Sequence, residues 1–300
     1  MLLPITLLLL VCIGLPPAQA WRLLRLREPT RSAWLLAAID AVVFVTLLML
    51  VGRWDVAGYW LRPLLAVVFL AALLWSWRNH RSRPWRADGA RRFWRRHWGT
   101  IASLAFFGSV LVHVLFGISP SAPARDMAFP LEGGRFMVGQ GGGIKLLNQH
   151  ASHRQQRHAA DIVALNALGF RASGILPVRL DAYAILGAAV VSPCAGTVVE
   201  ARDGLPDLTP GEMDPEHPAG NHALLDCDGL RVLLAHLQHG SVAVATGDPL
   251  TVGDPIGRVG NSGNTTEPHL HIHAFDPRTG EGVPIRFDGR APLRNRVFPH

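Results

Sequence analysis

The sequence predicts a multi-pass α-helical membrane region followed by a mainly-β domain built on an antiparallel sheet. Three observations predict this division. Four apolar stretches lie within the first 118 residues, a Pro/Ser/Ala-rich segment follows them, and short β-type runs between Gly-rich turns fill the remainder. The expected boundaries are 1–118 for the membrane region, 119–128 for a linker and 129–300 for the second domain.

The apolar stretches are expected to be four membrane spans. A helix needs about 20 apolar residues to cross about 30 Å of hydrocarbon, and the last three stretches have that length. The first is marginal and resembles the core of a signal peptide, with Ala18-Gln19-Ala20 as a cleavage site. We favour an uncleaved span, because Met1–Pro4 carries no positive side chain and the segment after Ala20 is rich in Arg. The stretches are 2–15, 33–51, 59–77 and 101–118.

The positive charge belongs to the membrane region. Residues 1–98 contain 14 Arg against 4 acidic residues, whereas residues 99–300 contain 15 basic against 18 acidic residues. A nucleic-acid partner is therefore a poor explanation of the basic composition. The Arg-rich loops 21–32 and 77–98 predict cytoplasmic loops. Both termini and the second domain are then expected outside the inner membrane, on the periplasmic side.

Asp40 and His113 are ionisable residues that fall inside the expected spans. Such residues raise a functional question by default. We expect Asp40 to face the bundle interior and pair with an Arg. An activity within the spans is the alternative, and it requires both side chains to face a shared polar cavity.

The seven runs expected to be strands belong to the second domain, as do two of the three cysteines of the chain. Cys194 and Cys227 lie at or beside such runs, and an oxidising compartment permits a disulfide between them, with two buried thiols as the alternative. Cys227-Asp228-Gly229-Leu230 predicts a tight hairpin turn, since Asp-Gly favours positive φ. The expected strands are 160–165, 188–192, 196–201, 222–226, 231–236, 255–259 and 269–275.

The strongest chemical signal is His269-Leu270-His271-Ile272-His273, which follows the turn Gly260–Pro268. Alternate side chains of a strand point to one face. The three histidines therefore line one face, while Leu270 and Ile272 face the core. Imidazoles spaced in this way can bind a metal together or divide the work between ligand and acid–base group.

Two further residues extend this set. His236 closes an apolar strand, where a buried imidazole is costly without a partner. Asp161 lies among small and apolar residues in Ala159–Val163. Taken singly, each has an ordinary structural reading. A catalytic zinc site, however, needs three protein ligands of the His, Asp or Glu type, and Asp161 with the C-terminal histidines supplies most of that set.

The order of these motifs resembles the lysostaphin-type zinc endopeptidases, also called LytM domains. Pro193–Val199 is similar to the strand–Gly–strand entry of the family, and Gly247–Gly263 is similar to its approach to the H-x-H strand. The resemblance covers about residues 139–284 and does not extend to the spans.

The resemblance implies a role for each matching residue. Asp161 and His271 correspond to zinc ligands, whereas His236 and His269 correspond to the histidines that move protons and stabilise the transition state. It also implies one Zn²⁺ per chain and hydrolysis of peptide bonds in peptidoglycan. Peptidoglycan and the membrane are thus the expected partners.

The sequence departs from the family pattern at the first metal ligand. The family's H-x-x-x-D motif would place this ligand four residues before Asp161, where the chain has Arg157. Three nearby histidines are candidates, and the expected order is His150, then His158, then His153. His273 is a fourth candidate. The alternative is that His273 is simply an exposed residue of the strand.

The sequence therefore predicts a membrane-anchored zinc endopeptidase that acts on the bacterial cell wall. The rival prediction is a catalytically inactive LytM domain that binds the wall or activates a partner hydrolase. The departure at Arg157 favours the rival, whereas the retained His236, His269 and His271 favour the enzyme.

Overall fold

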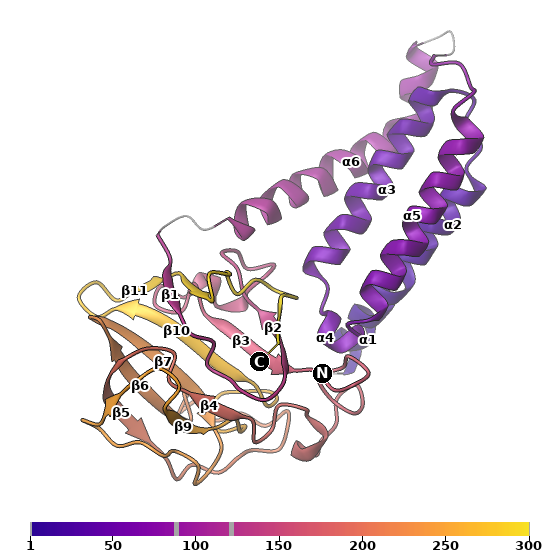
Figure 1. Cartoon of the computed structure of the whole chain (residues 1–300). Helices are drawn as coiled ribbons and strands as arrows, with labels where there is room; N and C mark the ends of the chain where they lie inside the picture. Colours follow the sequence, from indigo (N-terminus) through magenta and orange to yellow (C-terminus); the bar gives the residue numbers. More distant parts are fainter. Residues whose placement is uncertain (1, 87–89, 120–122, 300) are drawn as a thin grey trace. The chain divides into compact units, whose positions relative to one another are not determined.

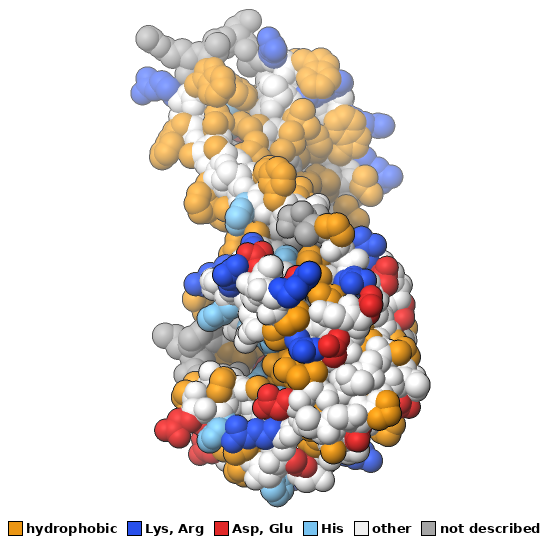
Figure 2. Space-filling view, turned by 90° about the vertical axis from the view of Figure 1, so that its left-hand side faces the viewer, with side chains coloured by type: hydrophobic (Ala, Val, Ile, Leu, Met, Phe, Trp, Pro, Cys, Tyr) orange, Lys and Arg blue, Asp and Glu red, His pale blue; other side chains and the backbone are white. Residues whose placement is uncertain are grey.

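The computed structural model of the chain describes residues 2–86, 90–119 and 123–299 (Figure 1). They form two compact units, Leu2–Phe116 and Gly117–His300. The first is helical and the second is rich in β-strands. Figure 2 shows hydrophobic side chains covering most of the helical unit, and side chains of both charges scattered over the β-rich unit.

The helical unit contains four helices that are long and apolar enough to cross a membrane. The first of these candidate spans, Ile5–Arg25, is longer than the sequence indicated, because a π-helical turn at Leu10–Gly14 joins α1 to α2. Among the spans, α2, α3 and α5 pack side by side. The helices are α1 (Leu2–Leu9), α2 (Leu15–Arg25), α3 (Arg31–Val51), α4 (Trp54–Ala57), α5 (Leu61–His80) and α6 (Ala90–Ile118).

Asp40 pairs with an arginine inside this unit, as the sequence analysis expected. Its carboxylate accepts hydrogen bonds from Arg22 of α2 at 2.9 Å and from Ser103 of α6 at 2.6 Å. The aspartate side chain is buried and the side chain of His113 is exposed. The two residues therefore do not share a polar cavity, and the ion pair joins helices instead.

The β-rich unit is built on one antiparallel sheet with strand order β13-β2-β3-β10-β7-β6-β5-β8, in which β11 also pairs with β10. Two smaller pairs lie beside it, a parallel pair of β1 with β12 and an antiparallel pair of β4 with β9. The strands are β1 (Arg125–Met127), β2 (Arg135–Gln140), β3 (Ala160–Ala164), β4 (Ala189–Val191), β5 (Gly196–Arg202), β6 (Asn221–Cys227), β7 (Leu230–Leu237), β8 (Pro249–Leu250), β9 (Pro255–Arg258), β10 (Leu270–Asp276), β11 (Glu281–Val283), β12 (Ile285–Phe287) and β13 (Val297–Pro299).

One face of the main sheet covers the hydrophobic core of this unit. Ile162 of β3, Leu234 of β7 and Ile272 of β10 are fully buried there, together with the aromatic cluster of Phe129 and Phe298, whose rings stack at 4.8 Å. Because strand side chains alternate, the residues between these positions point to the opposite face. That second face of β3, β7 and β10 carries the polar residues of the candidate site.

All seven expected strands are present, and each end differs from the expected one by at most one residue. Six further strands were not expected, because they are short or lie in Gly-rich sequence. One of them, β1 at Arg125–Met127, lies in the expected linker 119–128 and pairs with β12. The ordered part of the β-rich unit thus begins before residue 129.

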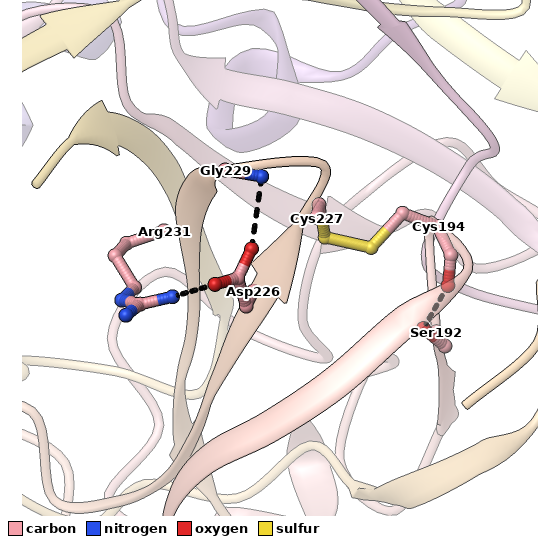
Figure 3. Close-up of a disulfide and its surroundings, with 6 residues drawn as sticks. All are labelled: Ser192, Cys194, Asp226, Cys227, Gly229 and Arg231. Carbon is pink, nitrogen blue, oxygen red and sulfur yellow. Dashed lines mark hydrogen bonds and ion pairs between the residues drawn. A yellow bond between two sulfur atoms is a disulfide. The ribbon is translucent and has the colours of Figure 1, made fainter. Parts of the chain in front are cut away.

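A disulfide joins Cys194 to Cys227 across 33 residues, with the two Cα atoms 5.9 Å apart (Figure 3). Cys227 ends β6, and the next two residues form the expected hairpin turn, with φ of 53° at Asp228 and 78° at Gly229. Beside it, Asp226 accepts a hydrogen bond from Gly229 N at 2.9 Å and forms an ion pair with Arg231. The bridge therefore ties the start of β5 to the β6–β7 hairpin.

Removing this disulfide is expected to destabilise the β-rich unit by about 3–4 kcal/mol, because a cross-link closing a loop of this length restricts the unfolded chain. The double variant C194A/C227A tests this in urea unfolding, beside wild type with and without reductant. Cys12→Ala is the matched control and should leave the transition of the β-rich unit unchanged. Equal midpoints for wild type and the double variant would contradict the expectation.

Candidate metal centre

Asp161 and His271 lie opposite each other on the two central strands β3 and β10. Their antiparallel register pairs the two residues directly, and directly opposed residues place their side chains on the same face. Asp161 Oδ1 lies 2.8 Å from His271 Nδ1. Both side chains are buried on the face opposite the core. The strand register thus assembles the first two polar groups of the site.

His150 reaches the same carboxylate from a short 3₁₀ helix at Gln149–Ser152. The fully buried Asn148 caps this helix, because its Oδ1 accepts a hydrogen bond from His150 N at 3.1 Å. Its amide nitrogen donates to Ala159 O at 3.0 Å, just before β3. Asn148 therefore fastens the helix to the strand that carries Asp161, and it brings His150 Nε2 to 3.0 Å from Asp161 Oδ2.

These three side chains are suited to hold a divalent cation such as zinc. The donor atoms of His150, Asp161 and His271 all lie within 4.8 Å of one another. Ligands about 2.0–2.2 Å from a common zinc ion are separated by little more than 3 Å, which is close to the separations found here. Two imidazoles and one carboxylate are also the donor types that zinc prefers at catalytic sites.

The charge state of the three groups favours cation binding. Burial opposes ionisation of Asp161, but the interactions with His269, His150 and His271 lower its pKa well below the usual value. Burial also opposes protonation of His150, but Asp161 raises the pKa of this histidine above its usual value. Burial lowers the pKa of His271. The lowered pKa of Asp161 therefore favours a cation at this site, whereas a proton on His150 would compete with the cation and would be released when it binds.

His236 joins the site because β7 contains a β-bulge. Ala235 is paired with His271 on one side and with His222 on the other, whereas Leu237 is paired with Asn221. His236 is therefore the extra residue, and its φ of 65° lies in the left-handed region. In a regular strand its side chain would point away from the face that carries His271. The bulge re-aims it, and its ring centroid lies 5.9 Å from that of His271.

His236 and His269 form a pair beside the three candidate ligands, with ring centroids 4.8 Å apart. The Nδ1–H of His236 donates to Ser262 O at 2.9 Å, and that of His269 donates to Glu267 O at 2.8 Å. Each ring is thus anchored through Nδ1 and turns Nε2 towards the site, where His269 Nε2 lies 3.6 Å from Asp161 Oδ1. Burial lowers the pKa of His236 well below its usual value, so that this ring is neutral.

The sequence was compared with known protein families. Residues 179–283 match the model of peptidase family M23. The chain carries an M23 domain. The matched range includes His236, His269 and His271, whereas His150 and Asp161 precede it. A comparison with curated proteins found no match.

Three solved structures are similar to parts of this chain. A zinc-containing peptidase from Vibrio cholerae is 26% identical over 34% of this chain and 26% of its own, with a TM-score of 0.26. Lysostaphin is 21% identical over 40% and 36%, also with a TM-score of 0.26. The complex of SpoIIIAH and SpoIIQ is 17% identical over 52% and 95%, with a TM-score of 0.35. The chain thus spans well under two thirds of the length of the first two.

The other histidines considered as a first ligand lie elsewhere in the β-rich unit. His153 is exposed and His158 is half-buried just before β3. Neither belongs to a group of converging donor atoms in the described part of the chain. His273 is buried, with 2% of its surface exposed, so the reading as an exposed strand residue is wrong. Burial, with a contribution from His271, lowers the pKa of His273 to about 2.

A buried ion pair that the sequence analysis did not find supports His269 in the M23 domain. Arg171, with 3% of its side chain exposed, donates to both carboxylate oxygens of Glu267, at 2.9 Å from Nε to Oε1 and 2.6 Å from Nη2 to Oε2. The backbone oxygen of Glu267 in turn accepts the hydrogen bond from His269. The two charged residues lie 96 positions apart, and no local pattern marks either of them.

Replacing Asn148 by Ala is expected to weaken metal binding and to destabilise the M23 domain by about 1–3 kcal/mol, because the helix cap is lost and buried carbonyl groups lose a donor. Titration with zinc against a chromophoric chelator and thermal unfolding measure the two effects. Asn166→Ala is the matched control, since Asn166 also caps a turn through Leu168 N and Phe170 N but contacts none of the candidate ligands. Unchanged zinc affinity in Asn148→Ala would contradict the expectation.

Proposed function

We propose that the chain is a zinc-dependent endopeptidase that hydrolyses peptide bonds in the stems or cross-links of peptidoglycan. The observation that carries this proposal is the convergence of five side chains on one face of β3, β7 and β10. His150, Asp161 and His271 are the proposed ligands, and His236 and His269 are the proposed catalytic residues. The match of residues 179–283 to peptidase family M23 and the resemblance of the H-x-H region to lysostaphin-type endopeptidases support the proposed substrate class.

The proposed mechanism assigns the proton transfers to His236 and His269. A bound zinc ion supplies Lewis acidity towards a carbonyl oxygen and towards water. Neutral His236 can accept at Nε2 the proton that water loses as it attacks the scissile carbonyl carbon. The imidazolium so formed can return a proton to the departing amine nitrogen, which leaves one carboxylate and one amine. His269, whose Nδ1–H is held by Glu267 O, directs its Nε2 to the same space and, when Nε2 also carries a proton, can donate it to the developing oxyanion.

The proposed location is the outer face of the cytoplasmic membrane. Four helices have the length and composition of membrane spans. The Arg-rich loops 21–32 and 77–98 favour an orientation in which both loops are cytoplasmic. The β-rich unit then lies in the periplasm beside the wall. The disulfide Cys194–Cys227 suits this oxidising compartment.

The rival function, an inactive wall-binding module, depended on the departure from the family pattern at Arg157. Arg157 is exposed. We propose His150 as the ligand in its place, because His150 Nε2 approaches Asp161 from a different segment of the chain. With His150, the proposed ligand set has three members, which favours the enzyme over the inactive module.

The test uses the full chain, purified in detergent, loaded with zinc and incubated with isolated peptidoglycan. We expect about one zinc ion per chain and the release of soluble muropeptides with new amino termini, both lost after treatment with a chelator and both regained with zinc. Stoichiometric zinc without new termini would support the inactive module. A folded protein that binds no zinc would refute the zinc peptidase.

A further inference from the structure

His273 contacts a proposed ligand but belongs to neither group of converging donor atoms in the described part of the chain. It lies two residues after His271 on β10, so both side chains point to the same face. His273 Nδ1 lies 2.9 Å from His271 Nε2, and both residues are buried. The roles proposed above for the metal ligands and the catalytic histidines do not explain this contact.

The positions of two protons follow from this contact. A hydrogen bond between two imidazole nitrogens contains one proton, so one ring donates and the other accepts. His271 Nδ1 faces Asp161 at 2.8 Å, and it is the nitrogen on the side of the proposed metal. A nitrogen that binds a metal carries no proton, so neutral His271 has its proton on Nε2. His273 Nδ1 must then be the acceptor, and the proton of His273 must be on Nε2.

We propose that His273 is a positioning residue whose Nδ1 accepts the Nε2–H of His271 and thereby fixes the tautomer and ring orientation with which His271 binds the metal. This inference rests on the proposed metal site. Histidine ligands commonly donate their second ring N–H to a carboxylate, a carbonyl group or water. Here a neutral imidazole takes that place.

The location of His273 in the sheet supports an orienting role. Leu233 of β7 is its cross-strand neighbour, and Phe275 follows it on the same face with the two ring centroids 5.7 Å apart. A buried imidazole is costly unless its polar atoms are satisfied. The backbone of β10 holds the two histidines at a fixed separation along the strand, so the contact needs no mobile segment.

Three variants of the full chain in detergent separate the hydrogen bond from simple packing. His273→Gln keeps a carbonyl oxygen that can accept from His271, whereas His273→Leu and His273→Phe keep bulk without an acceptor. We expect both apolar variants to bind zinc about 10–100-fold more weakly than wild type, measured by chelator competition. His273→Gln should restore most of the lost affinity. The visible spectrum of the Co²⁺-loaded protein should change in His273→Leu and His273→Phe and not in His273→Gln.

Each outcome bears on the proposal. Zinc affinity and Co²⁺ spectra equal to wild type in the folded apolar variants would overturn it, and so would an equal loss of affinity in all three variants. Thermal unfolding of the metal-free proteins identifies any variant that does not fold. If one of the two apolar variants does not fold, the other still provides the test. A wild-type chain that binds no zinc would overturn the proposed function as well, whereas failure of the positioning role alone leaves zinc binding by wild type intact.

Discussion

Replacing Asp161 by Asn is expected to abolish zinc binding and, with it, the proposed hydrolysis of peptidoglycan. Asp161 is the one carboxylate in the proposed ligand set, and it contacts His150 and His271 at 3.0 and 2.8 Å. The amide keeps the shape of the side chain but loses its charge. Two buried imidazoles would then face a neutral amide, whose oxygen binds a divalent cation much more weakly than a carboxylate oxygen does.

The expected loss of zinc affinity in Asp161→Asn is larger than the about 10–100-fold cost of changing a residue that only orients a ligand. Chelator competition measures the affinity, and muropeptide release measures the activity. Asp276→Asn is the matched control, because Asp276 ends β10, the strand that carries His271, and pairs with the exposed Arg278. A surface ion pair of this kind contributes at most about 1 kcal/mol. Stoichiometric zinc in folded Asp161→Asn would remove Asp161 from the ligand set.

Replacing His236 or His269 by Gln is expected to preserve zinc binding and to lower kcat by about 10²–10⁴-fold, the usual contribution of a general acid or base. Neither residue is needed to complete the set His150, Asp161 and His271, so the metal content should stay near one per chain. Both rings are anchored through Nδ1 and direct Nε2 towards the site, and Gln cannot accept and return a proton in the same way.

The measurement for this pair is zinc content together with kcat on a soluble cross-linked muropeptide. His239→Gln is the control, since His239 follows β7 closely but is exposed. The prediction thus distinguishes the proposed metal ligands, whose replacement should remove zinc, from the proposed catalytic histidines, whose replacement should not. Loss of zinc in His236→Gln would instead favour the other converging group, His236, His269 and His271, as the metal-binding set.

Much of the fold was predictable because it depends on local composition and on period-two alternation. The apolar stretches predicted four long helices, and the structure contains four helices with the length and composition of spans. The run His269–His273 predicted a strand with histidines on one face and Leu270 and Ile272 in the core, and that prediction is confirmed. The short strands β8 and β11 were not predicted, because pairing with a neighbour rather than their own sequence makes them strands.

By itself, the sequence determined the kinds of groups available for the site and the face of β10 on which the histidines lie. Only the tertiary structure decided which groups meet. His150 approaches Asp161 because buried Asn148 anchors its helix, which strand periodicity does not encode. His236 points to the site because a bulge reverses its facing in β7. Both depend on contacts between distant segments, whereas local sequence fixes only the period of a strand and the polarity of its side chains.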